Sequence, residues 1–175
     1  MSTPETYPLT ELEENFYQFY SDAGNLYHIY FKLNFQNDVV QLYSDNRDIE
    51  VYEYFFEIIS VNAVSSFDKK ITNTLIQTLE DFLKGAPYRI LFYITNRDDE
   101  RNYALFRIYE IWYRKYKKET DSRLLKCNRT IMQDDYVEAY LSCLYLDTDF
   151  TPDYLNQCLD TCLAEIYPNY KVLSE

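Results

Sequence analysis

The spacing of the hydrophobic residues changes at Asp68, and this change divides the 175-residue chain into two regions. Before Asp68, apolar and polar side chains alternate, as on a strand with one buried face. In the second strand of the first hairpin, Tyr27, Ile29 and Phe31 share the face that we expect to be the core face. After Asp68, apolar residues recur at every third and fourth position, which indicates an amphipathic helix. The first third of the chain is therefore predicted to be sheet.

The first region is predicted to form an antiparallel meander. Two strands flank a turn at residues 22–25, where Gly24 can supply a positive φ. A short strand at Val39–Tyr43 and a long strand at Ile49–Val61 then extend the sheet.

Strands and helices alternate after Asp68. The expected elements are a helix from Asp68 to Gly85, a strand at 88–95, a helix over 101–118, two hairpin strands at 123–132 and 136–147, and a helix at 152–167 followed by a short tail. This order predicts a single α+β domain over residues 1–175. Its mainly antiparallel sheet has about six strands, and three helices pack mostly on one face. The opposite face would then be exposed or covered by a partner.

The helix over 101–118 is both aromatic and basic. One broad face carries Leu105, Phe106, Tyr109, Trp112, Tyr113 and Tyr116. The other carries Arg107, Glu110, Arg114, Lys117 and Lys118, in which Glu110 and Arg114 have the favourable spacing for an ion pair. We expect the aromatic face to pack against the sheet, with Trp112 as its anchor.

The segment "YITNRDDERNYALFRIYEIWYRKY" follows "LEDFLKG" and an aromatic N-terminal hairpin. With these features the chain resembles a family of small bacterial proteins known only as a domain of unknown function. The matching positions are Tyr93, Ile94, Asp98, Arg101, Leu105, Phe106 and Trp112, together with the closing strand and helix. The resemblance extends over most of the chain. It implies a shared α+β fold and no particular activity.

No residue pattern in the sequence predicts catalysis. His28 is the only histidine, and no nucleophile motif accompanies it, so we expect a structural or surface role. The acidic clusters at 98–100, 134–135 and 147–149 match helix starts and turns. With only two glycines, at positions 24 and 85, the chain has no glycine-rich phosphate loop. No catalytic residue and no cofactor are therefore predicted.

The four cysteines pose the only question of a metal. Cys158 and Cys162 are four residues apart on one helix face, and Cys127 and Cys143 lie on neighbouring predicted strands. A zinc site is the alternative to core packing, but cysteine is among the most buried residue types. We therefore expect core packing and no metal.

The net charge of −12 argues against a general binder of nucleic acid or anionic membrane. The N-terminus has neither the basic end nor the apolar run of an export signal, which predicts a cytoplasmic protein with reduced thiols. Charge is also unevenly distributed. Residues 1–60 carry eleven acidic and two basic side chains, a net −9, whereas residues 101–118 carry six basic and one acidic, a net +5.

These features predict a non-enzymatic, acidic, tyrosine-rich protein that binds another protein or itself. An antitoxin, inhibitor or accessory component of a bacterial defence or toxin system is one setting for such a protein. The candidate binding residues are Tyr30, Tyr52 and Tyr54 on the sheet and Arg101, Arg107, Arg114, Lys117 and Lys118 on the basic helix. The alternative is an enzyme or factor that binds nucleic acid or nucleotide phosphates through helix 101–118.

Overall fold

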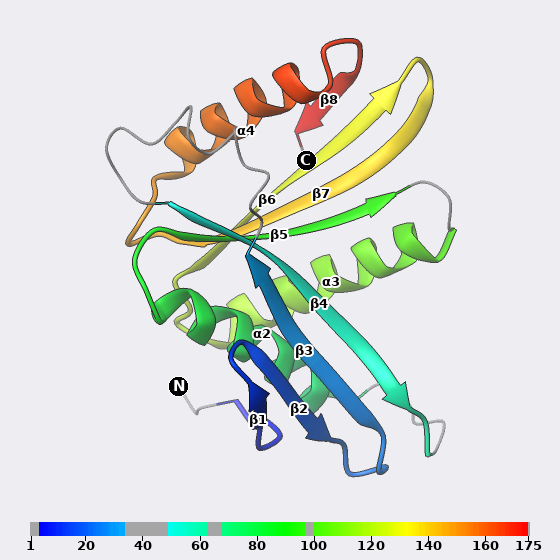
Figure 1. The fold of residues 1–175 in the computed structure, drawn as a ribbon, viewed down its shortest axis with the longest axis vertical. Coiled ribbons are helices and arrows are strands. Elements are labelled where there is room, and N and C mark those ends of the chain that lie inside the picture. The colour runs from blue at the N-terminus through cyan, green and yellow to red at the C-terminus, as the bar shows by residue number, and fades with distance from the viewer. Residues whose placement is uncertain (1–3, 34–48, 63–67, 97–99, 175) are drawn as a thin grey trace.

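The computed structural model describes residues 4–33, 49–62, 68–96 and 100–174, and its strands form one twisted sheet (Figure 1). The eight strands are β1 (Thr10–Glu13), β2 (Phe16–Tyr20), β3 (Leu26–Leu33), β4 (Glu50–Ser60), β5 (Arg89–Asn96), β6 (Leu124–Gln133), β7 (Tyr136–Leu146) and β8 (Lys171–Ser174). Their order across the sheet is β1, β2, β3, β4, β5, β7, β6, β8. Only the pair of β4 with β5 is parallel among the described pairs. The α+β class and the mostly antiparallel sheet are confirmed.

Three helices complete the described structure: α2 (Lys69–Lys84), α3 (Glu100–Glu119) and α4 (Pro152–Ile166). Asp68 caps α2, because its carboxylate accepts a hydrogen bond from the Lys70 amide at 2.8 Å. Thr151 caps α4 in the same way, and Pro152 occupies its first turn. Capping residues therefore mark where both helices begin.

Both predicted hairpins are present. Gly24 adopts a φ of 77° in the turn between β2 and β3, and Asp134 adopts a φ of 54° in the turn between β6 and β7. The sheet is larger than expected, because β1 and β8 were not predicted and add a four-residue strand at each edge. The strand predicted at Val39–Tyr43 lies outside the described residues.

The connections decide which face each helix covers. From β4 to β5 and from β5 to β6 the chain moves across the sheet in one direction, through α2 and α3. From β7 to β8 it moves in the same direction through α4, but β7 runs antiparallel to β5. Crossover connections share a right-handed preference, so reversing the strand direction places the helix on the other face. α4 consequently lies opposite α2 and α3 (Figure 1).

The sheet therefore has a core on each side. On one side, α2 and α3 pack over Tyr27, Ile29, Phe31, Tyr52, Tyr54, Leu91 and Leu144. On the other, the leucines of α4 pack over Ile90, Cys127, Ile131, Leu141, Cys143 and Tyr145. The expectation that the second face is wet or covered by a partner is corrected along β5, β7 and β6, where α4 covers it.

Arg129 fastens α4 to the sheet. Its side chain is 2% exposed, the largest fully buried one among the described residues. The guanidinium donates to Asp160 Oδ1 and Asn156 Oδ1, each at 2.7 Å, and to the Asn128 carbonyl at 2.9 Å. Since Asn156 and Asp160 are one helical turn apart, a single side chain holds the middle of α4 in place.

Arg89 joins three elements where the two halves of the sheet meet. Its Nε lies 2.9 Å from Glu50 Oε2 on β4, and its Nη1 donates to the Phe82 carbonyl at the end of α2 at 3.0 Å. The guanidinium also stacks over the Phe82 ring, 4.6 Å from its centroid. Glu50 and Arg89 are themselves partners in the parallel register. One side chain thus connects β4, β5 and the C-terminus of α2.

We expect Arg89→Met to lower the free energy of unfolding by about 2 kcal/mol, because it removes hydrogen bonds of a charged group that contribute roughly 1.5 to 3 kcal/mol. Urea denaturation measures the change. Arg123→Met, at an exposed arginine before β6, is the control and should leave the midpoint nearly unchanged. Equal midpoints for the two variants would show that Arg89 does not secure this junction.

Candidate functional site

One half of the sheet is covered on one side only. α4 lies over β5, β7 and β6, and Figure 1 shows it far from β2 and β3. Among the side chains of β2, β3 and β4 that point to the α4 side, we call the following group the N-terminal sheet face: Phe16, Gln18, Tyr20, His28, Tyr30, Lys32, Glu53, Phe55 and Glu57. All of them are half-buried or exposed. No helix of the described ranges covers this surface.

Aromatic rings pack against one another across the N-terminal sheet face. Tyr30 on the central strand stacks on Phe55 of β4, with ring centroids 4.7 Å apart. Phe16 of β2 meets Tyr30 edge-on at 5.6 Å and His28 edge-on at 4.9 Å. Cross-strand pairs of this kind stabilise a sheet without burying the rings fully. The rings therefore hold one another in place and remain partly accessible to solvent.

Charged groups surround these rings. The Tyr30 hydroxyl donates to Glu57 Oε1 at 2.7 Å. Partial burial, with the hydrogen bond to Glu57, raises the pKa of Tyr30 to about 12, so its hydroxyl stays protonated at neutral pH. The Lys32 ammonium lies 5.3 Å from the Tyr30 centroid and 5.0 Å from that of Phe55. The surface therefore combines aromatic, acidic and basic groups.

Exposed apolar side chains also lie near the β2–β3 turn, at the end of β2 and at the end of β4. Tyr20 is 58% exposed, Ile59 47% and Val61 64%. The register of β3 with β4 shifts here, so that Leu26 pairs with Ser60 while Tyr27 pairs with Ile58. Ile59 is the extra residue of this β-bulge. The bulge interrupts the regular alternation of β4 side chains between the two faces of the sheet. Apolar groups exposed this close together are typical of a contact surface.

The structure separates the residues predicted to bind on the sheet. Tyr30 lies on the N-terminal sheet face, but Tyr52 and Tyr54 are 7% and 3% exposed and belong to the core under α2 and α3. The physical reason is the register: Tyr30 pairs with Phe55, so the odd-numbered residues of β4 share its face and the even-numbered ones point to the opposite side. Tyr52 and Tyr54 are therefore removed from the candidate surface.

The predicted basic residues lie on α3, on the other side of the sheet from the N-terminal sheet face. Arg107, Arg114 and Lys118 are exposed, and Lys117 is half-buried with its ammonium bonded to the Ser122 carbonyl. The side chain of Arg101 lies outside the described residues. The predicted sheet and helix residues thus belong to two surfaces rather than to one site.

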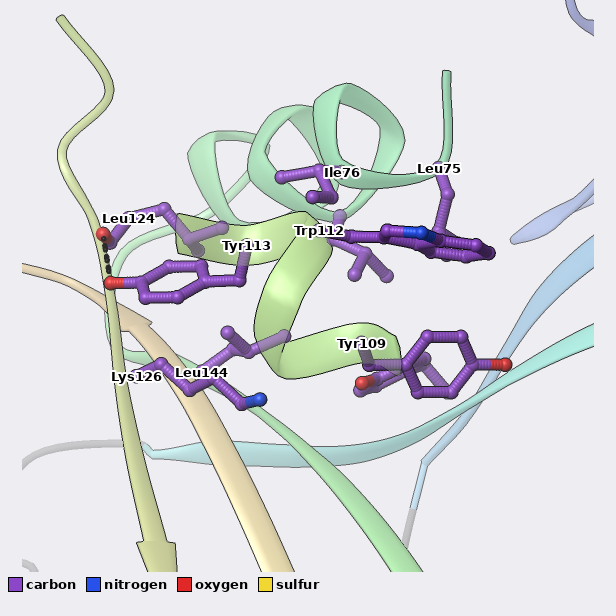
Figure 2. Close-up of a pocket in the computed structure, with 10 residues that line it drawn as sticks. Leu75, Ile76, Tyr109, Trp112, Tyr113, Leu124, Lys126 and Leu144 are labelled. Carbon is purple, nitrogen blue, oxygen red and sulfur yellow. Dashed lines mark hydrogen bonds between the residues drawn. The ribbon is translucent and has the colours of Figure 1, made fainter. Parts of the chain in front are cut away.

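The aromatic side of α3 is core, as expected. Phe106 and Tyr116 are 1% and 3% exposed, whereas Trp112, the expected anchor, is half-buried against the core. Figure 2 shows Trp112 beside Leu75 of α2 and Tyr113 bonded to the Leu124 carbonyl. The space between these side chains is about 20 Å³, the room of one water molecule. It is a packing gap rather than a substrate site.

A buried ion pair lies next to this gap and was not predicted. Glu110 makes the expected pair with Arg114 at 2.6 Å, but its second oxygen lies 2.8 Å from the Lys126 ammonium and accepts from Asn128 Nδ2 at 3.1 Å. The Lys126 side chain is only 4% exposed. Burial alone would raise the pKa of Glu110, but its hydrogen bonds and the charge of Lys126 lower it to about 2. The contacts of Glu110 with Lys126 and Asn128 fix α3 to β6.

The cysteines and the acidic residues form no metal site in the described part of the chain. The four cysteines form no disulfide, and Cys127, Cys143 and Cys162 are buried near α4. Burial raises the pKa of Cys143 and Cys162, which keeps these thiols protonated. In the described part of the chain, no group of three or more His, Cys, Asp or Glu side chains could hold a metal ion. Within the same ranges, no helix is long and apolar enough to cross a membrane.

Comparison with known proteins finds no family model, no curated protein and no solved structure that matches the chain. The resemblance to a bacterial domain of unknown function therefore stays a prediction.

We expect Glu110→Gln to lower the free energy of unfolding at pH 7 by about 3 kcal/mol, since a pKa shift of one unit corresponds to about 1.4 kcal/mol. Because the folded-state pKa lies below the ordinary 4.5, this contribution is complete above pH 4.5 and is lost as the pH falls toward about 2. Denaturation between pH 7 and pH 2.5 should therefore show the two proteins converging in acid. Glu165→Gln, at an exposed residue of α4, is the control. A difference that does not depend on pH would contradict the ion pair.

Proposed function

We propose that this protein is a non-enzymatic binding protein whose N-terminal sheet face binds another protein. The observation that carries the proposal is the uncovered aromatic surface centred on Tyr30 and Phe55, which borders the exposed Tyr20 and Ile59. Tyrosine supplies a large contact area and a hydroxyl at little entropic cost, which is why it is enriched at protein interfaces.

The charge of this surface favours a basic or mixed partner. Glu53 and Glu57 lie on it, and residues 1–60 carry a net charge of −9. Opposite charge on a partner would increase the rate of association and orient the encounter. An antitoxin, an inhibitor or an accessory component of a bacterial defence or toxin system would use such a surface to hold its target.

Nucleic acid binding through α3 has less support. Base stacking needs exposed rings, and Phe106, Tyr109, Trp112, Tyr113 and Tyr116 all pack in the core or against it. The exposed cations of α3 could contact phosphates only by charge, in a protein of net charge −12. The rings at the N-terminal sheet face, in contrast, are available for contact.

The proposal is tested by affinity purification from the native cell with wild-type protein and with the double variant Tyr20→Lys, Glu57→Lys. We expect the wild type to retain one protein in stoichiometric amount and the variant to bind the purified partner at least about tenfold more weakly, since interface residues such as tyrosine often contribute more than 1 kcal/mol. Thermal melting establishes that the variant is folded.

The matched control is the double variant Arg107→Glu, Lys118→Gln, which also changes the net charge by three, on the opposite side of the sheet. It should bind the partner as the wild type does. Loss of binding in the control with retention in the sheet variant would place the interface on α3. A wild-type protein that stays monomeric and retains no partner would refute the proposal.

A further inference from the structure

Two cysteines on neighbouring strands lie opposite each other under α4. Cys127 on β6 and Cys143 on β7 are direct partners in the antiparallel register, so both side chains point to the same face of the sheet. Both belong to the core that the leucines of α4 cover. The Cys127 sulfur lies 3.8 Å from the Cys143 carbonyl oxygen, which brings this sulfur against β7. We call these two residues the cysteine pair.

The backbone at the cysteine pair has the spacing that a disulfide requires. Directly opposite residues of antiparallel strands have Cα atoms about 4.5 to 5.5 Å apart. Disulfides in proteins join Cα atoms roughly 4.4 to 6.8 Å apart. The register of β6 with β7 is regular around the pair, because its one shift lies nearer the turn, between Ile131 and Met132. A bond between the two sulfurs therefore needs no change of register.

The two thiols of the pair differ in reactivity. A hydrogen bond from the Cys143 thiol, together with the positive charge of Arg129, lowers the pKa of Cys127 against the effect of burial. Burial and the same hydrogen bond raise the pKa of Cys143. Burial also raises the pKa of Cys162, to about 11. Since the thiolate is the nucleophile, we expect the Cys127 sulfur to react first.

Burial limits the cysteine pair to small oxidants. Cys143 is 0% exposed and Cys127 is 8% exposed, so a reagent from solvent meets Cys127. The edge strand β8 pairs with β6 from Arg129 to Met132, and Cys127 lies beyond the described end of that pairing. Hydrogen peroxide is little larger than a water molecule, whereas a peptide disulfide such as oxidised glutathione is far larger. Cys143 needs no access of its own, because its reaction with Cys127 is intramolecular.

We propose that the cysteine pair is a site of reversible oxidation, at which hydrogen peroxide converts the two thiols into a disulfide between β6 and β7. The Cys127 sulfur attacks one peroxide oxygen, the O–O bond breaks, and the other oxygen leaves as hydroxide, which takes up the thiol proton to form water. The Cys143 sulfur then attacks the sulfenic sulfur of Cys127, the S–O bond breaks, and a second water leaves with the proton of Cys143. The two thiols are oxidised and one peroxide is reduced. A dithiol restores both thiols by exchange.

The test treats the folded full chain with hydrogen peroxide, removes the peroxide with catalase, alkylates the remaining thiols in denaturant and maps the peptides by mass spectrometry. Trypsin combined with an aspartate-specific protease places the four cysteines on four different peptides. We expect the peptides of Cys127 and Cys143 to be linked, and dithiothreitol to separate them. Cys158→Ser, at the half-buried cysteine of α4, is the control and should form the same bond at the same rate.

Two variants test the order of the steps, and circular dichroism establishes that both are folded. Cys143→Ala should stop at a sulfenic acid on Cys127, which dimedone labels once the chain is unfolded. Cys127→Ala should slow the oxidation of Cys143 at least about tenfold, because no thiolate is left beside it. Equal rates of Cys143 oxidation with and without Cys127 would overturn this order.

The wild-type protein alone can refute the site. A bond from Cys143 to Cys162, a bond between two molecules, or no bond at all after peroxide treatment would each do so. Faster linking by oxidised glutathione than by hydrogen peroxide would overturn the assignment of the oxidant. None of these outcomes depends on whether the N-terminal sheet face binds a protein.

Discussion

The parallel pairing of β4 with β5 holds the molecule together, because it is the only strand pair that joins the N-terminal meander to the rest of the described sheet. The register covers only four residue pairs, from Glu50 with Arg89 to Glu53 with Phe92. Parallel pairs are slightly less stable per residue than antiparallel ones. The contacts of Arg89 with Glu50 and with the end of α2 reinforce the pairing at this point. α2 also packs on strands from both halves and so shares its core between them.

The handedness of the connections explains why the two halves of the sheet differ. All three helices follow crossovers in the same lateral direction, and only the last begins from a reversed strand. α4 is therefore placed over β5, β7 and β6, and no helix in the described ranges is left to cover β2 and β3 on that same face. The uncovered aromatic surface is a consequence of topology, and its tyrosine, phenylalanine and charged residues suit partial exposure. The order and direction of the strands therefore determine both the fold and the position of the candidate interface.

Much of the fold could be predicted from the sequence, because the apolar spacing and the caps are local signals. The change of period at Asp68, the start of the last helix at residue 152 and the turn at Gly24 each correspond to an observed feature. β8 could not be predicted in this way, since "KVLS" is short and becomes a strand only by pairing with β6. The face covered by α4 depends on strand direction, which no local pattern contains.

The candidate site was predictable only in part, for similar reasons. Tyr30 was assigned to the correct face because β3 alternates clearly, but β4 has aromatic residues on both faces, among them Tyr52, Tyr54 and Phe55. Only the register with β3 determines which of them are buried. The partner of Glu110 was also missed, because Lys126 is sixteen residues away and on a different element.

The two edge strands have a further consequence for how the protein behaves at high concentration. An open sheet presents unpaired backbone groups at both edges, and these can template the addition of strands from other molecules. Here both edges are four-residue strands that carry charge, with Glu11 and Glu13 on β1 and Lys171 on β8. The register of β1 is also irregular between Glu11 and Glu13. Edges that are short, charged and on one side irregular oppose fibrous stacking, so an eight-stranded open sheet can expose an aromatic face while its ends resist aggregation.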